Sequence, residues 1–145
     1  MKESKQEIEL EYNANDIFNI VLDIKKYPIY IPWCTDIEIL KINKNKIKAN
    51  MTVNYKLFPS QIFMSDVSFD KKKLFIKTDY VKGPLKDLKT EWKFIKINET
   101  NCKVIFSVKF EFKNFFYQKL AELFFPLIEK QMIESFIKRA KEILN

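Results

Sequence analysis

The sequence predicts an α+β domain in which an antiparallel sheet of seven strands wraps around a long C-terminal helix, with two short helices after the first strand. Three features indicate this fold. Between residues 36 and 112, runs of alternating apolar and polar residues are separated by polar turns. Residues 114–144 have the spacing of an amphipathic helix. Residues 13–34 carry a helix start signal followed by a proline-broken stretch. At 145 residues, the chain is expected to be one domain spanning residues 1–145.

The N-terminal region predicts a strand followed by a helix. Residues 5–11 alternate between polar and apolar positions, with Ile8 and Leu10 on one side of the expected strand. Asn13 has the side chain of a helix N-cap, because its carbonyl oxygen can accept a hydrogen bond from a free backbone amide. Apolar residues with helical spacing follow, so we expect a short helix that ends at about residue 23.

The next segment, YPIYIPWC at residues 27–34, is too short and too proline-rich for a regular helix. Pro28 suits the first turn of a helix and Pro32 tends to end one, so a broken second helix or turn is expected. Trp33 is expected either to pack in the hydrophobic core or to contact a ligand. Cys34 lies beside apolar residues, which favours a small buried side chain over a reactive thiol.

Six further strands are predicted by the alternating runs. They are expected at residues 36–42, 46–58, 60–69, 73–80, 89–97 and 101–112. The links between them are short and polar, which favours an antiparallel meander. One face of the last strand is apolar throughout: Cys102, Val104, Phe106, Val108, Phe110 and Phe112. The sheet is therefore expected to have one covered face and one face in water.

The C-terminal segment is expected to supply that cover. Its predicted apolar stripe consists of Phe116, Leu120, Leu123, Leu127, Ile133, Phe136, Ile137 and Ala140. Charged residues fall off the stripe, among them Glu122 and Glu129. Pro126 is expected to bend the helix, and a bent helix can follow a curved sheet.

Composition excludes several kinds of site. The chain has no histidine, a single glycine and two cysteines, so histidine-based catalysis, glycine-rich phosphate loops and the common zinc sites are unavailable. We assign no catalytic and no metal-binding residues. The net charge of +7 permits an anionic partner, but Arg139 is the only arginine, and nucleic-acid readers rely on arginine forks. DNA is therefore not an expected partner. The charged N-terminus and the lack of a long apolar run predict a cytoplasmic protein.

Several motifs resemble the START-like helix-grip fold, and more narrowly the coenzyme Q-binding and ribosome association toxin family of the polyketide cyclase-like group. They are YPIYIPWC at 27–34 behind Asp23, KGPLKDLKTEWKF at 82–94, KFEFKN at 109–114 and the closing FIKRAKEIL. The resemblance covers nearly the whole chain. Departures are Leu85 where phenylalanine is usual, Tyr30 in place of another aromatic residue, and Lys82 where an acid is common. These departures bear on the fine ligand specificity of the domain rather than on its membership of the family.

The resemblance implies a cavity between the sheet and the long helix. The residues expected to line it and bind a hydrophobic ligand are Trp33, Phe63, Tyr80, Trp92, Phe94, Phe106, Phe110, Leu123 and Leu127. The residues expected at its rim are Tyr27, Pro32, Gly83 and Pro84. For each phenylalanine, the alternative is packing in the hydrophobic core without contact to a ligand. Gly83 is expected in a turn where only glycine tolerates the backbone angle.

Three functions follow from this resemblance. The first is non-catalytic binding or chaperoning of a hydrophobic molecule, with ubiquinone as the implied ligand rather than a cofactor, in support of respiratory electron transport. Its lysine-rich exterior suits brief contact with an anionic membrane at the inner face. The second is a toxin-like protein that binds the large ribosomal subunit and blocks subunit association. The third, an enzyme of the cyclase kind, is disfavoured because histidine is absent. We therefore expect a protein that is not an enzyme.

Overall fold

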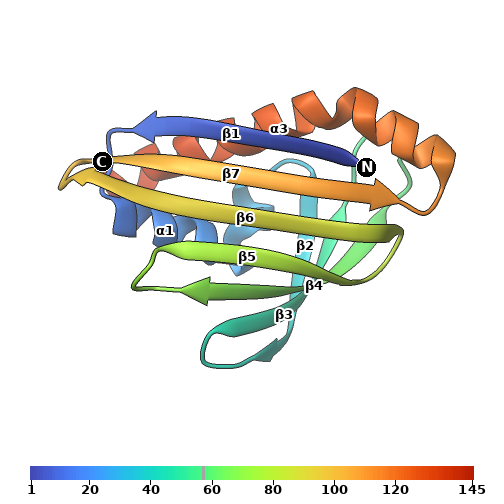
Figure 1. Ribbon diagram of the computed structural model, residues 1–145, viewed down its shortest axis with the longest axis horizontal. Coiled ribbons are helices and arrows are strands. Elements are labelled where there is room, and N and C mark those ends of the chain that lie inside the picture. The colour runs from blue at the N-terminus through green and yellow to red at the C-terminus, as the bar shows by residue number, and fades with distance from the viewer. Residues whose placement is uncertain (57) are drawn as a thin grey trace.

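The computed structural model describes residues 1–56 and 58–145, which form one antiparallel sheet with a long helix packed against one of its faces (Figure 1). The strands are β1 (Lys2–Leu10), β2 (Cys34–Ile42), β3 (Lys46–Val53), β4 (Gln61–Asp70), β5 (Phe75–Lys82), β6 (Leu85–Asn98) and β7 (Asn101–Phe112). The helices are α1 (Ala14–Leu22), the 3-10 turn η1 (Ile24–Lys26), α2 (Tyr27–Tyr30) and α3 (Phe115–Leu144). No helix of the described residues is long and apolar enough to cross a membrane.

The sheet has seven strands in the order β1-β7-β6-β5-β4-β3-β2. Strands β2 to β7 form a continuous meander, and β1 pairs with β7 at the far edge. The predicted fold class is confirmed by this arrangement. Because every neighbouring pair is antiparallel, the short polar links of the sequence suffice to join the meander strands.

Strand boundaries differ from the sequence prediction at a few places. The first strand covers Lys2–Leu10 rather than residues 5–11, because it pairs with β7 along that whole length. The strand predicted at 46–58 ends at Val53. Within the rest of that range, Leu57 lies outside the described residues. The last strand, Asn101–Phe112, has the predicted limits, and its alternate residues from Cys102 to Phe110 are buried.

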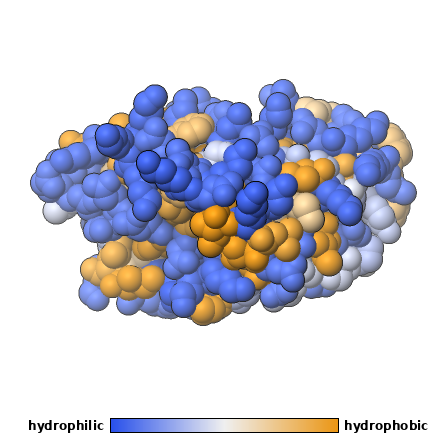
Figure 2. Space-filling view, turned by 90° about the horizontal axis from the view of Figure 1, so that it is seen from below, coloured by the Kyte–Doolittle hydropathy of each residue, from blue (hydrophilic) through white to orange (hydrophobic). Residues whose placement is uncertain are grey.

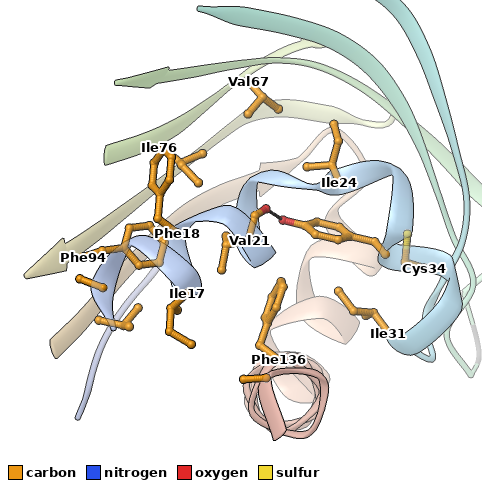
Figure 3. Packing of buried hydrophobic residues seen from close by; sticks show 14 of the residues in the cluster. Ile17, Phe18, Val21, Ile24, Ile31, Cys34, Val67, Ile76, Phe94 and Phe136 are labelled. Atoms are coloured by element: carbon orange, nitrogen blue, oxygen red, sulfur yellow. Dashed lines mark hydrogen bonds between the residues drawn. The ribbon is translucent and has the colours of Figure 1, made fainter. Parts of the chain in front are cut away.

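The short helices fill one end of the space beneath the sheet. The side chain of Asn13 accepts a hydrogen bond from the backbone amide of Asn15 and so caps α1 as predicted. Phe18 points from α1 to the sheet, where its ring lies edge-on to that of Phe94 at 5.6 Å. Figure 3 shows Phe18 between Ile76 and Phe94. Pro28 occupies the first turn of α2, a position that tolerates its missing amide.

The long helix runs without interruption through Pro126, which is exposed on its outer side. The apolar stripe predicted for this helix is partly wrong. Phe136 and Ala140 are buried as expected, but Phe116, Leu123 and Leu127 are exposed to solvent. The N-terminal half of α3 carries apolar residues on nearly all sides, so hydropathy alone does not fix which side faces the sheet. The residues that face inward are Gln118, Ala121, Phe125, Ile128, Glu129, Met132, Phe136 and Ala140.

Buried apolar residues form two clusters between the sheet and the helices. One is built around α1, α2, β2 and the C-terminal half of α3, with Phe18, Cys34 and Phe136 among its members. The other is built around Phe106, Val108, Phe110 and Ala121. Trp92 and Met132 pack against both clusters. The space between α3 and the sheet is therefore divided into a packed region under the short helices and a less filled region under the N-terminal half of α3.

Candidate functional site

An apolar cavity of about 260 Å³ lies between the sheet and α3. This volume is far above the ~10–15 Å³ that a single water molecule needs. The apolar and aromatic residues that line it are Ile24, Tyr27, Ile31, Trp33, Ile37, Ala49, Met51, Val53, Tyr55, Phe58, Phe63, Val67, Ile76, Leu85, Leu88, Trp92, Phe106, Val108, Phe110, Phe112, Ala121, Phe125, Ile128, Met132 and Phe136. The polar lining residues are Gln61, Ser65, Thr78, Thr90 and Glu129. Such a lining suits a hydrophobic molecule that carries a small number of polar groups.

The YPIYIPWC segment forms one wall of this cavity. Tyr27, Ile31 and Trp33 all line it. The Tyr27 hydroxyl donates a hydrogen bond to the backbone carbonyl of Val21, so the ring is held in place by α1. Its ring also packs edge-on against Phe136 of α3, with 5.4 Å between ring centres. Figure 3 shows Phe136 pointing from α3 toward this group of residues. Helix, segment and sheet are thus fixed together at this end.

Cys34, at the end of the same segment, is a buried structural residue. It is 1% exposed and begins β2. Burial raises the pKa of its thiol to about 11, because the ionised form would be poorly solvated there. Burial raises the pKa of Tyr27 well above its ordinary value for the same reason. Neither group is therefore ionised near neutral pH, which disfavours a nucleophilic role for Cys34.

Trp92 lies at the centre of the aromatic lining. Its ring centre is 4.4 Å from that of Phe106 on the neighbouring strand and 5.5 Å from that of Phe136 on α3. The register explains the first contact, because Trp92 and Phe106 are directly opposite each other in β6 and β7. The indole therefore separates the packed core from the open part of the cavity.

Aromatic pairs also close the other end, where the chain after β3 meets the start of α3. Tyr55 stacks on Phe124 at 5.9 Å, and Phe58 lies 6.0 Å from Tyr117 and 6.1 Å from Phe112. Phe115 and Phe116, next to Tyr117 in sequence, are exposed to solvent. This end of the cavity therefore lies close to an exposed aromatic surface.

The structure brings six of the sequence-predicted site residues together around the cavity. Trp33, Phe63, Trp92, Phe106 and Phe110 line it, and Tyr27, expected at the rim, lines it as well. Strand alternation accounts for the inward direction of those on the strands, whereas a cavity at this place was expected from the family resemblance. Contact of these residues with a ligand stays a prediction.

The other predicted lining residues lie elsewhere. Leu123 is 68% exposed and Leu127 is 47% exposed, because the side of α3 that carries them faces away from the sheet. Phe94 is buried against Phe18 of α1, in the packed core rather than at the cavity. The Tyr80 hydroxyl accepts a hydrogen bond from the backbone amide of Leu85 at 3.0 Å, which closes the turn between β5 and β6.

Three of the four residues expected at the rim do not line the cavity. Pro32 is exposed. Gly83 and Pro84 form the turn between β5 and β6, and the next residue, Leu85, is the one that lines the cavity. Gly83 has φ +146°, and a Cβ atom on it would lie 2.7 Å from the carbonyl oxygen of Ile62. The expectation that this turn needs glycine is confirmed, and a place for Gly83 at the cavity rim stays a prediction.

Sequence reasoning missed most of the helix lining. Phe125, Ile128, Met132 and Glu129 line the cavity from α3, and only the tertiary contacts show this. Glu129 was expected off the apolar stripe, yet it is 6% exposed. The start of β1 gives one retrospective signal, because Ser4 and Gln6 fall on the inward side of an edge strand. Polar residues on an inward side predict a polar partner there.

Comparison with known proteins agrees with this geometry. The family described as polyketide cyclase / dehydrase and lipid transport matches residues 10–137. The chain is 31% identical over 138 residues to ribosome association toxin RatA of Escherichia coli (strain K12), covering 92% of this chain and 84% of that protein. It is 28% identical over 138 residues to the protein of the same name from Rickettsia prowazekii, covering 94% of each. It is 29% identical over 145 residues to coenzyme Q-binding protein COQ10 homolog B, mitochondrial, of Xenopus laevis, covering 92% of this chain and 56% of that protein.

Solved structures of the same fold include enzymes and proteins of other kinds. The Zhui aromatase/cyclase from Streptomyces sp. R1128 superposes with a TM-score of 0.90 at 11% identity, over 99% of this chain and 96% of that one. A START superfamily protein from Mycobacterium smegmatis superposes with a TM-score of 0.81 at 16% identity, over 97% and 98%. At these identities the likeness establishes the fold alone. The chain thus has the START-like helix-grip fold and belongs to the polyketide cyclase / dehydrase and lipid transport family.

Proposed function

We propose that this protein binds and carries a hydrophobic molecule in the cavity between the sheet and α3, without chemically changing it. The observation that carries the proposal is the cavity itself, about 260 Å³ in volume and lined mainly by aliphatic and aromatic side chains. Transfer of an apolar molecule from water into such a space is favourable.

Ubiquinone is the ligand that we favour, in support of respiratory electron transport. One relative is named as a coenzyme Q-binding protein. A planar quinone ring matches the aromatic lining, where Trp33 and Trp92 offer ring faces and edges. The volume of about 260 Å³ is slightly below the roughly 300–1,000 Å³ usual for small-molecule sites. It suits a ring with the first part of its tail, while the rest of a long tail would extend from the cavity.

The composition of the cavity supports a carrier rather than an enzyme. Glu129 is the one acidic side chain among the described lining residues, and the chain has no histidine. General acid–base chemistry usually needs two groups of different proton affinity near each other. Asp66 and Asp79 are neighbours across β4 and β5, but Ser65 and Val67 take the inward positions on β4, so Asp66 faces outward.

A brief contact with an anionic membrane fits the surface of α3. Phe115 and Phe116 are exposed beside the cavity end, and Lys113 and Lys119 are exposed around them. Lysines near exposed aromatic side chains are attracted to acidic headgroups while the rings enter the interface. We propose this surface as the membrane contact of a peripheral protein at the inner face of the membrane, because it combines exposed aromatic rings and lysines next to one end of the cavity.

The direct test is mass spectrometry of organic extracts from protein purified without detergent. A quinone present in about one copy per protein chain is the expected result. The control is the same protein stripped by solvent extraction, refolded and offered ubiquinone. Protein that is empty as purified and stays empty after exposure to quinones would contradict the proposal.

Ribosome binding is the second candidate, and the names of the relatives from Rickettsia prowazekii and Escherichia coli favour it. The net charge of +7 supports an RNA partner. On the outer face of β6, Lys89 and Lys93 are exposed, and hydrophilic side chains surround a hydrophobic area on the face shown in Figure 2. Binding through lysine–phosphate contacts would weaken steeply with salt. Co-sedimentation with large ribosomal subunits at low and high salt tests this function, and absence of the protein from the pellet at low salt would contradict it.

A further inference from the structure

Glu129 places an acidic side chain inside an otherwise apolar cavity. It is 6% exposed, and it lines the cavity between Ile128 and Met132 on α3. Burying a carboxylate is unfavourable unless hydrogen bonds replace those that it makes with water. A residue kept at such a cost is a candidate for ligand recognition.

Only one oxygen of this carboxyl group has a hydrogen-bond partner among the described residues. Oε1 accepts hydrogen bonds from the Ser4 hydroxyl at 3.1 Å and from the Gln6 side-chain amide at 3.0 Å. Both donors come from β1, so the edge strand fixes the orientation of the group. Oε2 is buried and has no hydrogen-bond partner in the part of the chain that the structure describes. Among the described residues, Oε2 is therefore the unsatisfied acceptor of a side chain that lines the cavity.

The strand register puts other polar groups of the cavity at the same level. Ser4 is opposite Val108, Val108 is opposite Thr90, and Thr90 is opposite Thr78. This row crosses β1, β7, β6 and β5. At its β1 end, the Ser4 hydroxyl donates its hydrogen bond to Glu129. Thr78 and Thr90 both line the cavity. The polar head of a ligand would find its hydrogen-bond partners along this row, while aromatic residues on both sides hold its apolar part.

We propose that Oε2 of Glu129 accepts a hydrogen bond from a hydroxyl group of the bound ligand. The cavity then selects hydrophobic molecules with a hydroxylated ring, such as a phenol or a hydroquinone. It selects against rings whose oxygens are only ethers or carbonyls, because a carboxylate accepts hydrogen bonds and a carbonyl has none to donate. This inference rests on the proposed binding of a hydrophobic ligand. For a quinone carrier, it means that the reduced dihydroxy form is bound in preference to the oxidised form.

The test compares a para-alkylphenol with its O-methyl ether of the same tail, measured by isothermal titration on the intact chain. The two probes differ by one hydrogen-bond donor and have nearly the same apolar surface. The wild-type protein is expected to bind the phenol about 10- to 100-fold more tightly, the range for a hydrogen bond to a charged group. Equal affinities would overturn the inference and leave the hydrophobic-ligand proposal standing.

The matched variants are Glu129→Met and Glu134→Met. Methionine keeps the length of the side chain and removes its acceptor. In Glu129→Met the phenol is expected to bind no more tightly than the ether. Glu134 is exposed on the same helix, so Glu134→Met is expected to keep the wild-type ratio.

Circular dichroism checks that both variants fold. If one of them does not, the ratio of phenol affinity to ether affinity in the wild-type protein still tests the inference. A Glu129→Met variant that folds and keeps the preference for the phenol would overturn the inference, because another group would then be the acceptor. If neither probe binds to wild-type protein, the hydrophobic-ligand proposal fails and the inference falls with it.

Discussion

The indole Nε1 of Trp33 donates a hydrogen bond to the backbone carbonyl of Ile128, 3.3 Å away in the middle of α3. Both residues line the cavity. This bond joins the proline-rich segment before β2 to the helix that covers the sheet, and so fixes the distance between them at one point. It explains why YPIYIPWC is both stiff and aromatic: the prolines restrict the turn, and the aromatic rings form a cavity wall.

Replacing Trp33 with alanine is expected to weaken ligand retention more than folding. The side chain is only half-buried and borders an open space, so its loss enlarges the cavity without unpacking the main core. We expect ligand to dissociate about tenfold faster or more, while the free energy of unfolding falls by about 1–2 kcal/mol. Trp33→Phe, which keeps an aromatic ring and removes the hydrogen bond, is the control. A large loss of stability with unchanged ligand dissociation would make the residue part of the core.

The orientation of α3 predicts that two positions close in sequence differ in their effect on ligand affinity. Phe125 lines the cavity, whereas Leu127 is exposed on the other side of the helix. Phe125→Ala is expected to weaken ligand binding by about tenfold or more, because the ligand loses apolar contact area. Leu127→Ala is expected to leave the affinity unchanged. Titration with a fluorescent hydrophobic probe measures both, and a stronger effect at Leu127 would mean that the helix is rotated.

Gly83→Ala is expected to destabilise the turn between β5 and β6. The backbone at Gly83 has φ +146°, and the added Cβ would lie 2.7 Å from the Ile62 carbonyl oxygen and 2.9 Å from the Tyr80 hydroxyl. Strain of this kind costs about 1–3 kcal/mol. Urea denaturation is the measurement, with the exposed neighbour Lys82→Ala as control. A midpoint equal to that of wild type would show that the turn relaxes freely.

The exposed aromatic residues at the start of α3 predict vesicle binding. Phe115 is 75% exposed and Phe116 is 64% exposed, with lysines close by. The double variant Phe115→Ser, Phe116→Ser is expected to partition at least tenfold less into vesicles that contain acidic lipid, because each ring loses about 1.5–3 kcal/mol of burial. Ile29→Ser, at an exposed position on α2, is the control. Equal partitioning of all three proteins would exclude this surface as the membrane contact.

Stability is expected to fall in the alkaline range because of Cys34. Its pKa is raised from 9.0 to about 11 in the folded protein, so between these values the unfolded chain releases a proton that the folded chain keeps. The unfolded state then binds fewer protons, and the free energy of unfolding decreases as pH rises. Below pH 9 this contribution is fully present. Urea midpoints measured across this range should fall less steeply for Cys34→Ala than for wild type, and identical slopes would contradict the assignment.

The sequence by itself determined the fold class, the order of the elements and the inward face of β7. These features depend on short-range chemistry: alternation along strands, the Asn13 cap and the positions of the prolines. The need for glycine at position 83 was also predictable from the turn. Alternation also accounts for the inward direction of the lining residues on the strands, whereas the cavity itself was an implication of the family resemblance.

The tertiary structure alone decided which side of α3 faces the sheet and what the polar groups of the cavity do. Apolar residues surround the N-terminal half of that helix, so its orientation depends on tertiary contacts, among them the hydrogen bonds with the distant strand β1. Glu129 is buried because Ser4 and Gln6, more than 120 residues earlier in the chain, donate hydrogen bonds to it. Hydropathy treats each charged residue as exposed, and only a partner brought close by folding can make its burial favourable.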